Sequence, residues 1–256
     1  MRTAGHTWFM VVRQTRNLMR EPIWIAMMVI QPLIWLLLYG QLFSRVPALR
    51  GGASSYVEFL TPGIVCMNAF FGGMWAGMAM INDLDRHVID RFLAAPASRL
   101  AIVLSQVVRA GITAILQAAL LLAVGYGLGV SVHGGAAGWL VVFGASALLA
   151  MVFAGFSNGI ALLVRKEASM IATANFVGLP LMFLSSILLT TKTMPNWMQS
   201  VARYNPVNWG VEASRNAVVL GGAWWTSGQF LLFLLAASAA TTAFATWTFR
   251  AYQRSI

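Results

Sequence analysis

The sequence contains few charged residues and almost no cysteine. Only 9% of its 256 residues are charged, Asp and Glu together number 7, and Cys66 is the single cysteine. A globular domain usually carries about 25% charged residues, because water must solvate its surface. The chain is therefore too poor in charge for a water-soluble, disordered or coiled-coil protein. One cysteine forms neither an internal disulfide nor a cysteine-based metal site.

Hydrophobic residues are what the sequence has in excess. They make up 59% of the chain, and the mean hydropathy is +0.74, which indicates that lipid is its main solvent. The net charge is +10 and the pI about 11.1. In a soluble protein this charge would suggest nucleic-acid binding. In a membrane protein it is explained by arginines and lysines that gather in cytoplasmic loops.

Long uncharged stretches indicate membrane-spanning helices, because a helix needs about 20 apolar residues to cross the hydrocarbon core. Six spans follow from these stretches, since His133 and neighbouring glycines divide the longest one, between Ala110 and Val164. We therefore predict an all-α, polytopic membrane protein with a six-helix transmembrane domain over residues 22–256. The predicted spans are 23–43, 59–82, 100–130, 139–164, 168–190 and 229–249.

The distribution of basic residues predicts the orientation in the membrane. Six spans place both termini on one side, together with the loops after spans two and four. That side carries 12 of the 17 Arg and Lys residues. Cytoplasmic loops carry the excess of basic residues, so both termini are predicted to be cytoplasmic.

Residues 1–21 precede the first span and have the pattern of an amphipathic helix on the membrane surface. At 100° per residue, Trp8 lies on an apolar face, whereas Arg13, Arg16 and Arg20 lie on another. Such a helix places its apolar face at the acyl boundary and its arginines at anionic headgroups. The alternative is a basic flank without a defined fold.

The loop after span two, residues 83–95, is the most highly charged segment and predicts a short amphipathic helix at the cytoplasmic surface. Its charges alternate with apolar residues at helical spacing, and Pro96 ends the pattern. This mixture favours docking of a protein partner, with packing against the protein's own helices as the alternative. The candidate docking residues are Asp83, Leu84, Asp85, Arg86, Val88, Asp90, Arg91 and Phe92.

The segment 194–222, before the last span, is too polar to cross the membrane and too apolar to be a free loop. We predict two short helices that enter the outer interface and separate at Asn205 and Pro206. Trp224 and Trp225 would then mark the headgroup level before the last span. The simpler interpretation is an aromatic belt without a further role.

Three segments resemble the membrane subunit of ABC-2 type exporters, in the branch similar to daunorubicin-resistance permeases. They are 59–64 at the start of the second span, 82–99 around the charged segment, and 194–215 on the outer side. Their order and spacing around the spans carry the resemblance more than any single motif, and it covers essentially the whole chain. His87 departs from the pattern, since the family often has glycine there.

The resemblance implies a permease in the bacterial inner (plasma) membrane that works as a dimer of identical or closely related copies. Spans one and five are the expected dimer face. A separate ATPase subunit is expected to dock on each copy at residues 83–95, beside the N-terminal surface helix. ATP hydrolysis there would move a hydrophobic substrate outward, either a drug, an antibiotic or a lipid-like molecule. Lipid-linked polysaccharide is the alternative, and the sequence does not identify the substrate.

The chain lacks the residues for handling ATP itself. A P-loop needs the pattern G-x-x-x-x-G-K-[ST], and neither Lys166 nor Lys192 follows such a loop. ATP and Mg²⁺ are therefore expected on the partner ATPase, and no cofactor or metal is expected on this chain. Proton coupling is disfavoured because the spans nearly lack acidic residues.

A rival enzyme hypothesis comes from residues 155–159, which match G-x-S-x-G within the fourth span. An intramembrane serine hydrolase would use Ser157 as nucleophile, and needs a base within reach, usually histidine. His6, His87 and His133 are all predicted outside the spans. Small residues at this spacing more often let helices approach closely, so we predict a non-catalytic subunit.

Overall fold

The computed structural model describes residues 22–86 and 99–253. This part of the chain is all-α, as the sequence predicted. Its α-helices are α2 (Pro22–Leu42), α3 (Tyr56–Asp85), α5 (Arg99–Gly127), α6 (Gly135–Val164), α7 (Glu167–Phe183), α8 (Asn196–Tyr204), α9 (Pro206–Val218) and α10 (Trp224–Gln253), with short 3-10 helices η1 (Pro47–Leu49) and η2 (Thr191–Thr193).

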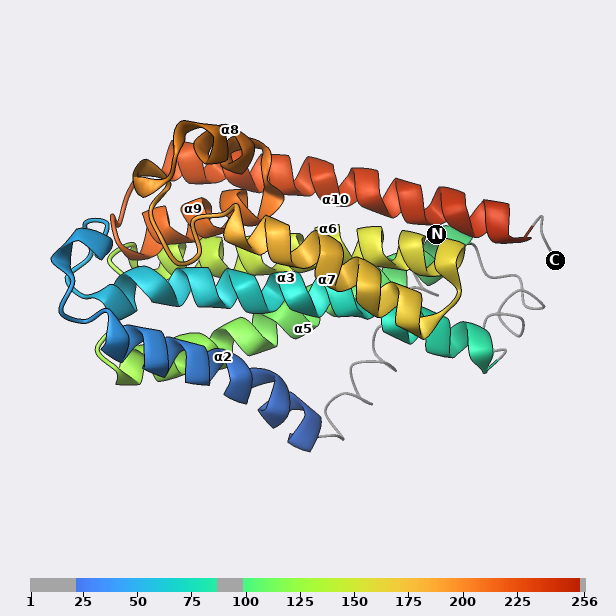
Figure 1. The fold of residues 1–256 in the computed structure, drawn as a ribbon, viewed down its shortest axis with the longest axis horizontal. Helices are drawn as coiled ribbons and strands as arrows, with labels where there is room; N and C mark the ends of the chain where they lie inside the picture. Colours follow the sequence, from blue (N-terminus) through green and yellow to red (C-terminus); the bar gives the residue numbers. More distant parts are fainter. Residues whose placement is uncertain (1–21, 87–98, 254–256) are drawn as a thin grey trace.

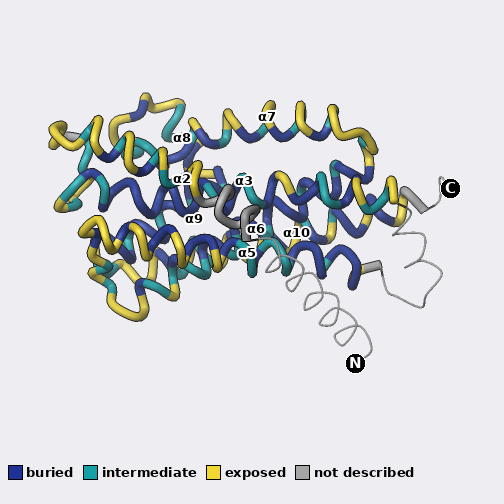
Figure 2. Tube along the Cα trace, turned by 90° about the horizontal axis from the view of Figure 1, so that it is seen from below, coloured by how far each residue is buried: buried dark blue, intermediate teal, exposed yellow. Residues whose placement is uncertain are grey.

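The long helices lie side by side along one axis (Figure 1). Helix α6 packs against α3, α5, α7, α9 and α10. Helix α7 runs along one edge and exposes one of its sides (Figure 2). We call the end where α3 and α6 finish the inner end, and the opposite end, which holds α8 and α9, the outer end. These names follow the predicted orientation.

Four helices of the described part, α3, α5, α6 and α10, are long and apolar enough to cross a membrane. Each has 29 or 30 residues, which is about 44 Å against a hydrocarbon core of about 30 Å. Helix α7 and the residues Ile30–Leu42 of α2 are shorter apolar helices. The fold is that of a polytopic membrane protein.

Helix α7 is shorter than the uncharged stretch 168–190 suggested. It ends at Phe183, three residues after Pro180, and residues 184–190 continue without helical structure. The carbonyls of Leu184, Ser186 and Leu188 accept hydrogen bonds from distant side chains instead of from a further helical turn. The donors are Asn205 just before α9, Arg215 within α9 and Tyr56 of α3. Uncharged composition alone does not reveal such partners, which lie far away in the sequence.

Other helix boundaries differ from the expected ones by a few residues. Helix α3 extends three residues beyond the predicted 59–82 at each end, so Asp83 belongs to its last turn. Helix α10 begins at Trp224, five residues earlier than predicted, and includes both tryptophans that were expected before the last span.

Glycines of α3 allow it to pack directly against the backbone of α6. A Cβ atom at Gly73 would lie 2.5 Å from the carbonyl oxygen of Ala150, and one at Gly77 would lie 2.7 Å from that of Ser157. No side chain fits at these distances. The two helices therefore approach as closely as small residues permit, which maximises their van der Waals contact in lipid.

Replacing Gly73 with alanine is expected to lower the free energy of unfolding by about 1–3 kcal/mol, because the added methyl group overpacks the α3–α6 contact. Gly72→Ala is the matched control, since the nearest atom to its new Cβ is Gln117 Oε1 at 3.8 Å. Thermal unfolding of both variants in one detergent measures the difference. Equal melting temperatures would contradict the close packing at Gly73.

Candidate functional site

The last turn of α3 holds the described part of the predicted docking segment. Asp83 is half-buried and accepts a hydrogen bond from Gln106 Nε2 at 3.0 Å. Leu84 packs against a buried apolar cluster formed by α3, α5, α6, α7 and α10. Asp85 and Arg86 are exposed at the inner end. Of these four residues, the first two contact their own bundle and the last two are exposed.

The other predicted site residues lie outside the part of the chain that the structure describes. They belong to the rest of the docking segment and to the membrane-surface helix, and their roles stay predictions. These residues are Val88, Asp90, Arg91 and Phe92, and Trp8, Arg13, Arg16 and Arg20.

Arg215 of α9 is a buried cation at the outer end, with 6% of its surface exposed. Its Nη2 donates a hydrogen bond to the Ser186 carbonyl at 2.7 Å, and its Nε donates to the Phe59 carbonyl at 3.4 Å. The guanidinium carbon lies 3.8 Å from the centre of the Phe59 ring. Nη1 lies 3.5 Å from the Glu212 carboxylate. This side chain therefore joins α9 to α3 and to the non-helical segment 184–190.

The charge of Arg215 persists despite its burial. Loss of hydration lowers the pKa of Arg215 to about 10, while the nearby Glu212 carboxylate acts in the opposite direction. The guanidinium is therefore a cation at neutral pH. Charged donors form stronger hydrogen bonds to carbonyl oxygens than neutral donors do, so Arg215 stabilises the Ser186 carbonyl, which lies outside any helix.

Two asparagines bind the same stretch of backbone. Asn205 Nδ2 donates to the carbonyls of Leu181 and Leu184, at 2.7 and 2.9 Å, where α7 ends. Asn208 Oδ1 accepts a hydrogen bond from the backbone N–H of Ser186 at 3.0 Å. These side chains satisfy backbone groups that the end of a helix leaves unpaired.

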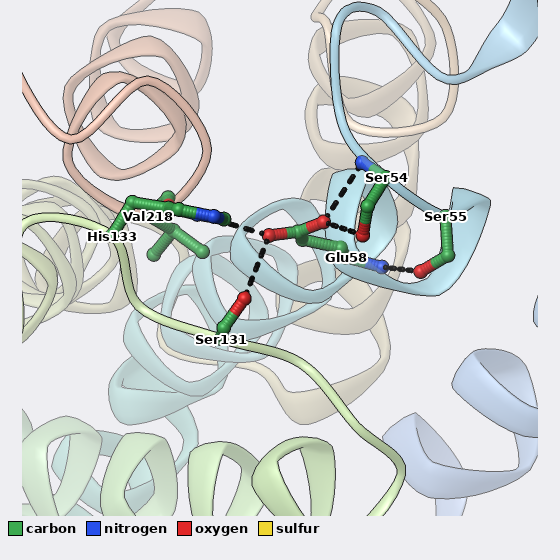
Figure 3. A network of polar contacts seen from close by, with 6 residues as sticks. All are labelled: Ser54, Ser55, Glu58, Ser131, His133 and Val218. Carbon is green, nitrogen blue, oxygen red and sulfur yellow. Dashed lines mark hydrogen bonds and ion pairs between the residues drawn. The ribbon is translucent and has the colours of Figure 1, made fainter.

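A second polar network surrounds Glu58 in the first turn of α3 (Figure 3). Its carboxylate is 1% exposed and accepts hydrogen bonds from the backbone N–H and hydroxyl of Ser54 and from the hydroxyl of Ser131. His133 Nδ1 lies 3.2 Å from the carboxylate and 3.1 Å from the Val218 carbonyl. Both neighbours are acceptors, so Nδ1 carries the proton that they share. The network connects the loop before α3, the turn between α5 and α6, and the end of α9.

Comparison with known proteins decides the family. The sequence profile of the ABC-2 type transporter family matches residues 5–219. The chain belongs to this family. It is 30% identical over 208 residues to the candidate transport permease ycf38 of Cyanophora paradoxa. That alignment covers 80% of this chain and 71% of the relative. It is 26% identical over 256 residues to the daunorubicin resistance ABC transporter permease protein DrrB1 of Streptomyces coeruleorubidus. That alignment covers 98% of this chain and 86% of the relative.

In this ABC-2 permease, the G-x-S-x-G segment serves to pack helices. Ser157 is fully buried, and its hydroxyl donates to the Gly73 carbonyl at 2.9 Å and accepts from the Gly77 N–H at 3.0 Å. Gly155 and Gly159 lie against α10, whose side chains leave no room for a Cβ atom. A nucleophilic serine instead needs a hydrogen bond to a base. The geometry favours the packing role over the hydrolase hypothesis.

Ser157→Ala is expected to lower the free energy of unfolding by about 1 kcal/mol, because one buried Gly77 N–H and one buried carbonyl lose a partner. Ser146→Ala is the control, since among the described residues that buried hydroxyl bonds within its own helix, to the Val142 carbonyl. A fluorophosphonate probe is expected to label neither variant nor the wild type. Labelling of the wild type that disappears in Ser157→Ala would contradict the packing role.

The sequence interpretation did not identify the two outer networks of the permease. Glu58 stands one residue before the predicted span 59–82, and Arg215 lies within the predicted outer segment 194–222. The available signal was an isolated charge beside apolar residues, which in membrane proteins marks a group with a specific partner. The partners lie up to 156 residues away along the chain, so spacing did not reveal them.

Arg215→Gln is expected to lower the free energy of unfolding by about 3 kcal/mol, because the carbonyls of Ser186 and Phe59 lose a charged donor. Arg203→Gln removes the same charge from an exposed side chain in α8, and is expected to have little effect. Thermal unfolding of the purified permease measures both changes. A loss of similar size in the two variants would show that net charge, rather than this network, matters.

Proposed function

We propose that this permease is the membrane subunit of an ATP-driven exporter in a bacterial inner membrane. It moves a hydrophobic substrate outward, such as a drug, an antibiotic or a lipid-like molecule. The observation that carries the proposal is the family match over residues 5–219. The name of the Streptomyces coeruleorubidus relative includes daunorubicin resistance, which supports a drug-like substrate over lipid-linked polysaccharide.

Six crossings of the membrane require α2 and α7 in addition to the four long helices. Helix α2 has 21 residues, or about 31 Å, which matches the hydrocarbon thickness. Helix α7 has 17 residues, or about 25 Å, and segment 184–190 continues toward the outer end. Backbone groups of that segment are hydrogen-bonded within the protein, as lipid requires. Both termini then lie in the cytoplasm.

Helix α3 is suited to transmit motion from an ATPase to the outer end. Its 30 residues, about 45 Å in length, carry Asp85 and Arg86 at the inner end and Glu58 and Phe59 at the outer end. The helix contacts α2, α5, α6, α7 and α9. A displacement of its inner end therefore reaches both outer networks. The energy comes from hydrolysis of ATP, which the ATPase binds together with Mg²⁺, since the permease sequence has no P-loop.

Two permease copies, each with one ATPase, form the proposed transporter. Large apolar side chains are exposed on the two helices that the family resemblance assigns to the dimer face. They include Leu38 and Leu42 on α2, and Phe176 and Phe183 on α7. A second copy would cover these side chains, and lipid would cover them in an isolated permease.

Charge reversal at Asp85 tests the docking proposal. Asp85→Lys is expected to reduce co-purification with the partner ATPase by about tenfold, because like charge at a docking surface costs several kcal/mol. Substrate-stimulated ATP hydrolysis is expected to fall with it, while membrane insertion is unchanged. Glu167→Lys is the control, since it reverses another exposed acid at the inner end, at the start of α7.

The docking proposal is wrong if Asp85→Lys leaves both ATPase co-purification and stimulated hydrolysis at the wild-type level. It is also wrong if Glu167→Lys reduces both by the same factor, because the effect would then report surface charge in general.

A further inference from the structure

Asn175 carries an amide side chain on the exposed face of α7. It is the middle residue of this 17-residue helix, about 12 Å along the helix axis from Glu167. Glu167 is exposed at the inner end, and the hydrocarbon core is about 30 Å thick. Asn175 therefore lies near the middle of the membrane in the proposed arrangement, too deep for its short side chain to reach water.

The Asn175 amide has hydrogen-bonding groups that the described part of the chain does not use. Nδ2 donates one of its two N–H groups to the Ile171 carbonyl at 3.1 Å, within α7 itself. No described residue accepts from the second N–H or donates to Oδ1. The hydrocarbon of a lipid offers neither a donor nor an acceptor. An amide left unpaired in lipid costs free energy, so we expect a protein partner for it.

Asn175 belongs to a line of residues with the spacing of a helix–helix seam. Ala168, Ala172, Asn175 and Leu179 follow one another at intervals of four, three and four residues. All four are exposed, on the open side of α7 (Figure 2). Side chains at this spacing form the contact between two parallel helices of a coiled coil, where a single Asn fixes the register.

A second copy of the permease fits this surface better than substrate or water does. An amide has N–H donors and a carbonyl acceptor, so it is complementary to another amide. Two copies related by a two-fold axis along the membrane normal present the same residue at the same depth. Phe176, the next residue, is 82% exposed and apolar, which suits a packed interface more than a water-filled path.

We propose that Asn175 pairs with the partner's Asn175 in a dimer of the permease. Each amide donates its free N–H to the Oδ1 of the other, so both N–H groups and the oxygen of each side chain are then used. The pair places α7 against α7 and fixes the register of the two copies. This inference rests on the two-copy arrangement of the proposed function and names the residue at its axis.

Oxidative crosslinking of cysteine variants in membranes tests the pairing without ATPase or substrate. The single native cysteine, Cys66, is buried, so each variant has one accessible thiol. With copper phenanthroline, Asn175→Cys is expected to form a covalent dimer several-fold faster than Phe176→Cys. Phe176 is the matched control, because it is exposed at nearly the same depth but lies about 100° further around the helix.

The affinity of the dimer tests the amide itself. Asn175→Leu is expected to weaken the dimer about tenfold, since it removes the hydrogen bonds between the two helices in the membrane. Asn175→Gln keeps an amide and is expected to retain most of the affinity. Gln229→Leu is the control, because it removes an exposed amide from α10. Dilution of fluorescently labelled permease in detergent, followed by energy transfer, measures these affinities.

The possible failures separate this inference from the proposed function. Covalent dimers of Leu38→Cys or Phe183→Cys, but not of Asn175→Cys, would overturn the pairing and leave the two-copy arrangement intact. No covalent dimer from any of these variants would overturn both. Rapid reaction of Asn175→Cys with a water-soluble maleimide would show that this position faces an aqueous path, and the pairing would be wrong. An unchanged affinity of folded Asn175→Leu would show that the amide is not part of the dimer contact.

Discussion

The buried Arg215 side chain is the interaction on which the outer half of the permease depends. Lipid supplies no hydrogen-bond partner, so a chain that leaves helical structure inside a membrane protein must find its partners within the protein. Arg215, Asn205 and Asn208 supply them to segment 184–190. Because a cation stacked on Phe59 also binds the α3 backbone, the same group fixes the position of α9 against the longest helices.

Helix α3 connects the chemically distinct parts of the molecule. Its outer end contributes Glu58 to one buried network and Phe59 to the other. Its middle packs against α6 through Gly73 and Gly77 with no intervening side chains. Such close backbone contact limits independent movement of the two helices, since packed interfaces in proteins are stiff. This rigidity suits the coupling role proposed for the exposed Asp85 at its inner end.

Polar side chains within the bundle bond to one another and to the backbone of neighbouring helices. Asp83 and Ser157 bond to neighbouring helices, which accounts for their presence among apolar residues. Arg109 is bonded to Gln106 but retains a buried Nε that no described residue binds. All three side chains therefore have hydrogen-bond partners within the described bundle.

Composition and periodicity determined the class of this protein. A helix that crosses lipid must be long and uncharged, and such a stretch can be recognised in the sequence without knowledge of any contact. The positions of the four long helices, and the division of the outer segment at Asn205, were predictable for this reason. The sequence did not show that α7 would stop at Phe183, that Arg215 would be buried, or that Asp83 would turn inward while Asp85 faces solvent. Those outcomes depend on partners 21 to 156 residues away, and only the packing of helices against one another brings such partners within hydrogen-bond distance.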